Sequence, residues 1–173
     1  MKVAWTHDSV NNKTSDWYTP PWIFEKLGVE FDLDPASPIG GVPWIPAKKH
    51  YSLEDDGLKR SWHGSVWLNP PYGKETGSWL QAMNQHKNGI VLVFARTDTK
   101  WYHEFLTKAD AILFLKGRIK FIDGLNKTGK SGAGSGSLLA AWGEKHIKAL
   151  SKNKALGHLV VNKTDWSTWA GLV

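Results

Sequence analysis

The chain has 173 residues and a formal net charge of +6, and 41% of its residues are hydrophobic. These values are typical of a soluble globular protein, and no apolar stretch reaches the roughly 20 residues that a membrane-spanning helix requires. The chain has no cysteine, which excludes a disulfide framework and thiolate metal sites and favours a cytoplasmic location. The basic balance favours an anionic partner such as a nucleic acid, although a basic surface that only keeps the protein soluble fits equally well.

The first third of the chain predicts a helix followed by a strand. Residues 1–15 have no periodic pattern and are expected to form a loose lead-in. Residues 20–28 begin with two prolines, carry apolar residues on one face and end in glycine, so they predict a helix with Thr19 as its cap. Residues 29–35 alternate like a strand, and residues 36–63, rich in glycine, proline and charge, are expected to be mainly irregular.

The middle of the chain alternates strands with helices. Strands are expected over residues 66–68, 90–95 and 111–115, and helices over 75–87 and 101–106. This alternation predicts a doubly wound α/β fold with a mixed, mostly parallel sheet flanked by helices.

The last third predicts two more strands. After a basic turn over residues 116–118, an extended segment runs to Ile122 and leads into a flexible basic loop over 123–136, which is followed by a strand over 138–142. A short basic stretch and a strand over residues 158–161 complete the chain. No linker divides the chain, so we expect a single domain over residues 1–173.

Residues 124–131 match the Walker A pattern Gly-x-x-x-x-Gly-Lys-Ser, in which Lys130 would reach nucleotide phosphates. That motif requires a helix beginning at the Lys-Ser pair, whereas residues 132–136 are mostly glycine and disfavour a helix. A loop that contacts DNA phosphates explains the composition better, and a P-loop nucleotide hydrolase remains an alternative.

The most informative stretch is the tetrad Asn69-Pro70-Pro71-Tyr72, which directly follows the apolar residues 66–68. Its prolines fix two φ angles and remove two N–H donors, so the turn is rigid and rich in acceptors. Open α/β sheets bind their ligands at the carboxyl ends of parallel strands, where this turn is expected. Acceptors beside an aromatic ring suit a flat base with an exocyclic amine. A rigid turn with Asn69 as a cap is the structural alternative.

Further landmarks accompany the tetrad in order across about residues 16–142. They are Trp17-Tyr18-Thr19-Pro20, Phe31-Asp32-Leu33-Asp34-Pro35-Ala36-Ser37, Asp56-Gly57-Leu58, Trp67-Leu68-Asn69-Pro70-Pro71-Tyr72-Gly73, Arg96-Thr97-Asp98-Thr99 and Gly117-Arg118-Ile119-Lys120-Phe121. With these landmarks the chain resembles the phage-type, Dam-like DNA N6-adenine methyltransferase family. The resemblance implies a Rossmann-like fold, S-adenosylmethionine as the cofactor, no metal, DNA as the partner, and the host cell of a phage or prophage as the location.

The resemblance implies that Asn69, Pro70, Pro71 and Tyr72 form the catalytic set. The Asn69 side-chain oxygen and the Pro70 carbonyl would accept the two hydrogens of adenine N6, which localises its lone pair towards the methyl group. Tyr72 would stack on a base flipped out of the helix. Positioning would supply most of the rate enhancement.

The resemblance also implies a set of cofactor-binding residues: Thr19, Pro20, Asp32, Asp34, Pro35, Asp56 and Asn69. Either Asp32 or Asp34 would bind the methionine ammonium, and the sequence leaves both open. Asp56 would bind the ribose or the adenine amine, with an ordinary Asp-Gly turn as the equal alternative. A plain helix cap similarly competes with cofactor binding at Thr19 and Pro20.

Six basic residues are candidates for phosphate contacts: Lys74, Arg96, Arg118, Lys120, Lys127 and Lys130. Methylation of cytosine N4, of RNA or of a protein glutamine could use the same tetrad, as could a non-catalytic DNA-binding protein on the same fold. Asparagine at position 69 favours adenine over cytosine by resemblance. Little chain remains for a recognition domain, so we expect short or relaxed sequence specificity, and no obligate protein partner is evident.

Overall fold

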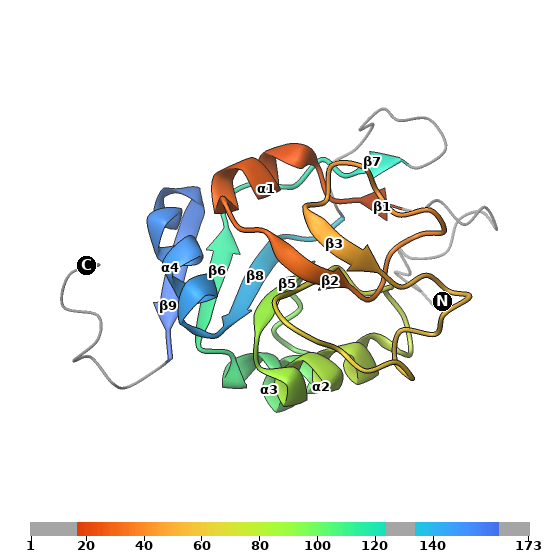
Figure 1. Ribbon diagram of the computed structural model, residues 1–173. Helices are drawn as coiled ribbons and strands as arrows, with labels where there is room; N and C mark the ends of the chain where they lie inside the picture. Colours follow the sequence, from red (N-terminus) through yellow and green to blue (C-terminus); the bar gives the residue numbers. More distant parts are fainter. Residues whose placement is uncertain (1–16, 124–133, 163–173) are drawn as a thin grey trace, which may run out of the picture.

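A computed structural model describes residues 17–123 and 134–162 of the chain (Figure 1). Its main sheet has seven strands, in the order β3 (Ala47–His50), β2 (Phe31–Asp34), β4 (Val66–Leu68), β5 (Gly89–Phe94), β8 (Ser137–Trp142), β6 (Ala111–Leu115) and β9 (Gly157–Val161). Pairing is parallel from β3 to β5 and antiparallel from β5 to β9. The expected mixed α/β sheet is confirmed, but only the half from β3 to β5 is parallel throughout.

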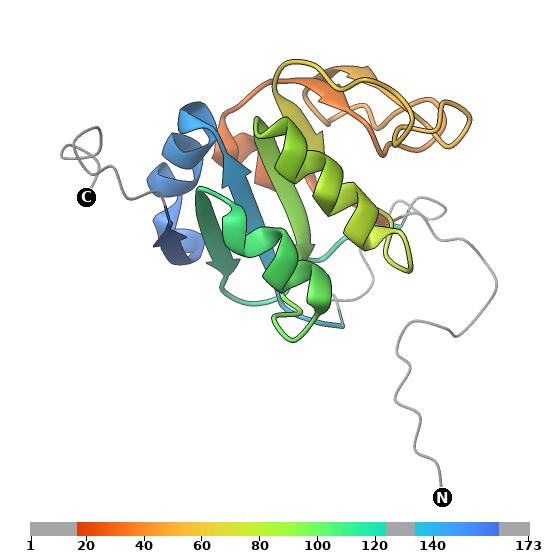
Figure 2. The same cartoon turned by 90° about the horizontal axis from the view of Figure 1, so that it is seen from below.

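Helices cover both faces of this sheet (Figures 1 and 2). The helices α1 (Pro21–Leu27) and α4 (Glu144–Lys152) pack on one face, and α2 (Thr76–His86) and α3 (Lys100–Glu104) lie on the other. Short 3-10 helices follow α3 and α4 at Leu106–Lys108 and Lys154–Leu156. Within the described residues, no helix is long and apolar enough to cross a membrane.

The central strands are buried on both faces, as their continuous apolar sequence predicted. Trp67 belongs to the core beneath α1 and α4, while its neighbours Val66 and Leu68 belong to the core beneath α2. All three side chains are fully buried. Burial of each large apolar side chain contributes about 1.5–3 kcal/mol to stability, so β4 is held rigidly at the centre of the molecule.

One expectation about local structure is wrong: Pro20, with no side-chain cap bond, occupies the position expected for Thr19 at the start of α1. Residues 36–63 are mainly irregular, as expected, and also contain the short strand β3, which is mostly exposed and lacks alternation, so only its pairing with β2 defines it. The basic stretch after residue 143, for which no element was expected, forms α4, whose buried Ile147 and Leu150 are spaced by one turn.

A separate two-stranded ribbon joins distant parts of the chain. It pairs β1 (Trp17–Tyr18) with β7 (Ile122–Asp123) in antiparallel register. The expected lead-in over residues 1–15 and most of the expected loop over 123–136 lie outside the described residues.

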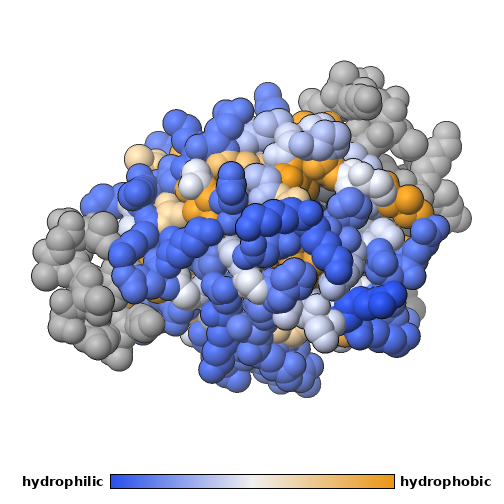
Figure 3. Space-filling view, in the orientation of Figure 1, coloured by the Kyte–Doolittle hydropathy of each residue, from blue (hydrophilic) through white to orange (hydrophobic). Residues whose placement is uncertain are grey.

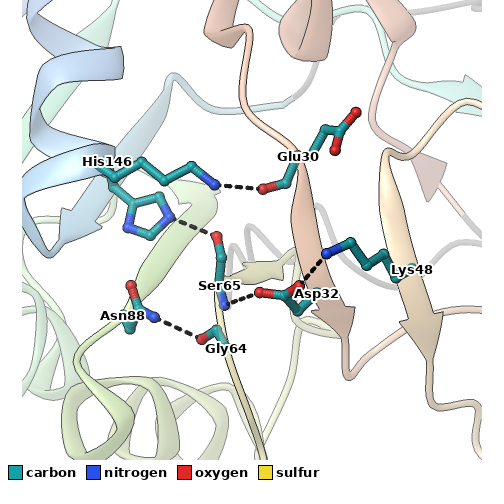
Figure 4. Close-up of polar contacts among 8 residues, drawn as sticks. Glu30, Asp32, Lys48, Gly64, Ser65, Asn88 and His146 are labelled. Atoms are coloured by element: carbon teal, nitrogen blue, oxygen red, sulfur yellow. Dashed lines mark hydrogen bonds and ion pairs between the residues drawn. The ribbon is translucent and has the colours of Figure 1, made fainter.

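A partly buried polar network closes the amino ends of β4 and β5 (Figure 4). His146 Nδ1 lies 2.8 Å from the carbonyl oxygen of Trp142, and Nε2 lies 2.7 Å from the Ser65 hydroxyl. A carbonyl only accepts, so Nδ1 carries the proton and Nε2 of the neutral ring accepts from Ser65. Asn88 donates to the Gly64 carbonyl oxygen in the same network. The network ties α4 to the start of β4.

The buried position of His146 makes folding depend on pH. Burial lowers the pKa of His146, so the folded protein keeps this ring neutral where the unfolded chain takes up a proton. The unfolding free energy is therefore expected to fall as the pH drops below about 6.5, by at most about 1.4 kcal/mol per pH unit. Urea unfolding of the wild type and His146→Gln at pH 7.5 and 5.5 tests this: the stability gap between them should narrow at the lower pH. A stability gap that is the same at both pH values would contradict a neutral, buried His146 in the folded protein.

Candidate functional site

The strand directions bring the sequence landmarks to one edge of the sheet. The strands β3, β2, β4 and β5 are parallel, and β6 points the same way as β5 because both are antiparallel to β8. Their carboxyl ends therefore share an edge, called here the carboxyl edge. The turns that follow β2, β4, β5 and β6 carry the landmark residues, and ligands of open α/β sheets bind at this position.

Asn69 presents an unpaired acceptor at the carboxyl edge. Its Nδ2 lies 3.5 Å from the carbonyl oxygen of Trp17 in β1, a long hydrogen bond. Its Oδ1 is buried and has no hydrogen-bond partner among the described residues, and Pro70 beside it is buried as well. A buried polar atom without a partner costs about 1–3 kcal/mol. Such an atom is a candidate acceptor for a donor from a ligand.

The tetrad turn is locked by a residue that the sequence analysis missed. The hydroxyl of Thr76, in the first turn of α2, donates to the Pro71 carbonyl oxygen and accepts from the Gly73 amide, both at 3.0 Å. Gly73 has φ of 143°, which side chains rarely tolerate. A threonine at the start of a helix that follows a turn is the signal that could have identified this lock.

Tyr72 contributes an aromatic face to the same edge. Its ring is stacked on Phe94, with centroids 4.1 Å apart and planes 13° apart, and 41% of the residue is exposed. Burial around the hydroxyl raises the pKa of Tyr72, so the phenol stays neutral at physiological pH.

Thr19 carries a second unpaired polar atom. Thr19 is 1% exposed, and its Oγ1 has no hydrogen-bond partner among the described residues. Its carbonyl oxygen accepts a 2.8 Å hydrogen bond from the indole of Trp44, which ties the loop after β2 to the start of α1. Trp44 has no local sequence signal for this contact, because its partner lies 25 residues away.

The two aspartates of β2 have different environments. The Asp32 carboxylate pairs with Lys48 at 2.8 Å and accepts from the Ser65 amide, and these bonds lower the pKa of Asp32 to about 2 (Figure 4). Asp34 ends β2 at the carboxyl edge, and burial raises its pKa to about 7, against a hydrogen bond from the Ala36 amide. No ion pair to Asp34 is formed within residues 17–123 and 134–162. Of the two aspartates, Asp34 is thus the one whose carboxyl group has no cationic partner among the described residues.

The Asp56–Gly57 turn packs beside the end of β2. A Cβ added to Gly57 would lie 2.0 Å from the Pro35 carbonyl oxygen, so only glycine allows this approach. Asp56 has φ of 54° and forms a 2.7 Å ion pair with Lys59, which leaves its side chain 45% exposed. The Asp56 carboxylate therefore lies on the side of the carboxyl edge where Asp34 ends β2.

Basic and apolar side chains surround the site. Four of the predicted phosphate contacts are exposed and follow β4, β5 or β6: Lys74, Arg96, Arg118 and Lys120. The remaining two, Lys127 and Lys130, lie outside the described residues, as does the Walker A match. Trp17 of β1 and Trp22 of α1 are 43% and 38% exposed. The face seen in Figure 3 is mostly hydrophilic and carries small hydrophobic patches.

Comparisons with known proteins identify the family of this chain. Residues 6–167 match the profile of the family described as DNA N-6-adenine-methyltransferase (Dam). A protein named DNA N-6-adenine-methyltransferase from Escherichia phage T1 is 31% identical over 148 residues, which cover 71% of this chain. The match covers 60% of the phage protein, so the chain spans less than two thirds of that relative. No solved structure gives a significant match. The chain belongs to the Dam family of DNA N-6-adenine-methyltransferases.

Proposed function

We propose that the protein transfers a methyl group from S-adenosylmethionine to the N6 amine of adenine in DNA, on a Rossmann-like fold. The observation that carries this proposal is the buried, unpaired Oδ1 of Asn69 at the carboxyl edge, followed by the donor-free prolines and the stacked ring of Tyr72. Membership of the Dam family supports the same substrate.

The tetrad suits the chemistry of this amine. The lone pair of adenine N6 is delocalised into the ring, so the amine is a poor nucleophile. Asn69 Oδ1 and the Pro70 carbonyl would accept its two hydrogens and localise the lone pair towards the methyl donor. Tyr72 would hold a flipped-out base by stacking, a contact that contributes about 1–3 kcal/mol in comparable complexes.

The unpaired groups beside the tetrad fit the proposed cofactor. S-adenosylmethionine would supply an electrophilic methyl group on a sulfonium sulfur. The Asp34 carboxylate, which is buried and has no cationic partner among the described residues, would bind the ammonium of its methionine part, while Asp32 keeps its ion pair with Lys48. The Thr19 hydroxyl, which has no partner among the described residues, would donate to the same methionine part of the cofactor. Pro20 and Pro35 would pack beside that part. Asp56 would accept from the ribose hydroxyls or the adenine amine.

The basic residues of the carboxyl edge suit a DNA backbone. Lys74, Arg96, Arg118 and Lys120 follow strands that end at the carboxyl edge, as the tetrad does, and Lys127 and Lys130 extend the proposal to residues beyond those described. Phosphate contacts carry no sequence information by themselves. We therefore propose that specificity is short or relaxed, covering one or two bases around the adenine.

One incubation tests the substrate class. Purified protein, DNA and cofactor labelled in the methyl group are incubated, and the DNA is digested to nucleosides. The expected product is labelled N6-methyldeoxyadenosine, with little label when RNA replaces DNA. Label in N4-methyldeoxycytidine, or none in DNA, would contradict the proposal. Sequencing of the methylated sites addresses specificity, and four or more strictly required base pairs would exclude a relaxed enzyme.

A further inference from the structure

Three aromatic rings form a contiguous cluster at the carboxyl edge. Tyr72 lies nearly parallel on Phe94, the last residue of β5, with centroids 4.1 Å apart. Phe121, just before β7, meets Phe94 edge-on, with centroids 6.3 Å apart and planes at 90°. Tyr72 is 41% exposed and Phe121 only 5%. Through Phe94, the cluster therefore connects the partly exposed ring of Tyr72 to the buried ring of Phe121.

Within the described part of the chain, this arrangement leaves one face of Tyr72 for a ligand. Phe94 covers the other face, and parallel and edge-on contacts are both favoured geometries for aromatic pairs. The guanidinium carbon of Arg96 lies 5.9 Å from the centroid of the Phe94 ring. A tyrosine at a turn without such support would sample several ring planes, and ordering it on binding would reduce affinity. Phe94 removes that freedom before a base arrives.

We propose that Phe94 is a positioning residue that fixes the ring plane of Tyr72, so that the target base stacks only on the face opposite Phe94. Phe94 does not touch the base and acts through Tyr72, and Phe121 holds Phe94 in turn. This inference deepens the proposed function and rests on it. It assigns a role to a side chain that looks in sequence like any apolar residue at the end of a buried strand.

A double-mutant cycle tests whether Phe94 acts through Tyr72. In Phe94→Leu, kcat for DNA methylation is expected to fall roughly tenfold, the scale of one weakened base stack, with cofactor affinity unchanged. Phe94→Tyr keeps the ring and is expected to retain most of the rate. Tyr72→Ala is expected to lose more, and the double variant no more than Tyr72→Ala alone, because the two rings act as one unit.

Phe114→Leu is the matched control. Phe114 is also partly buried and lies near the end of β6, but it packs against the core on the other face. Its loss is expected to reduce stability to a similar extent and to leave kcat unchanged. A merely structural role for Phe94 would instead lower kcat in both leucine variants in proportion to their stability.

Additive effects of the two substitutions, or an unchanged kcat in Phe94→Leu, would overturn the proposal. If the wild type transfers no methyl group, the proposed function fails, and the same cycle is then measured by quenching of 2-aminopurine in a single-stranded oligonucleotide. Weaker quenching in both single variants, with no further loss in the double variant, would still support the positioning role. Independent losses, or none in Phe94→Leu, would refute it.

Discussion

Asn69→Ala is expected to lower kcat for methyl transfer by about 100- to 1,000-fold, the usual effect of removing one preorganised polar group from a transition state. The variant loses the unpaired buried oxygen that would accept a hydrogen from adenine N6. Its affinity for DNA should change little, because the exposed basic residues remain. Rates measured with saturating cofactor and DNA, together with binding by fluorescence anisotropy, separate the two effects.

Asn88→Ala is the control for this variant. Asn88 is also an asparagine next to a central strand, but it lies at the amino end, where it donates to the Gly64 carbonyl oxygen. Its removal is expected to cost stability and to leave kcat within about twofold of the wild type. Methyl transfer retained by Asn69→Ala would rule out the proposed mechanism.

The second large effect concerns Asp34 and the pH dependence of cofactor affinity. Burial raises the pKa of Asp34 to about 7, so below pH 7 a proton must leave before the carboxylate can bind an ammonium. Affinity should rise with pH by up to about tenfold per unit towards pH 7, and fall again above about pH 8 as the cofactor's own amine deprotonates. Titration calorimetry across pH 5.5–8.5 should show this maximum of cofactor affinity in the wild type. In Asp34→Asn, the rise of affinity between pH 5.5 and 7 should be absent.

The same substitution is expected to stabilise the protein without cofactor. Because the folded-state pKa of Asp34 exceeds the unfolded value, the wild type loses stability as the pH rises from about 4 to 7. Asp34→Asn avoids that loss, so its advantage in unfolding free energy should grow over this range, to the order of a few kcal/mol, and then level off. Urea unfolding at several pH values measures it.

Asp32→Asn separates the two aspartates. It breaks the ion pair with Lys48 but is expected to keep the rise of cofactor affinity towards pH 7. If Asp32→Asn lost this rise of affinity and Asp34→Asn kept it, Asp32 and not Asp34 would be the aspartate that binds the cofactor ammonium.

Much of the framework was predictable because its signals are local. The apolar run of β5 and the proline tetrad directly after β4 were sufficient to place the turn at a strand end. Asp32 and Asp34 have the same local pattern, two residues apart on one strand. What separates them is Lys48 on β3, in a segment whose composition predicts a loop. Phe94 and Trp44 were missed for a similar reason, since each owes its role to a partner more than 20 residues away.

The polar network of Ser65 and His146 and the tetrad occupy opposite ends of β4, so the length of the strand separates them. The chain also contains no cysteine, so an introduced thiol would be its only one. A single cysteine at the exposed Lys145, beside the network, would therefore carry a dye or a surface tether at one defined position. The protein could then be immobilised or followed by fluorescence with its carboxyl edge facing the solution.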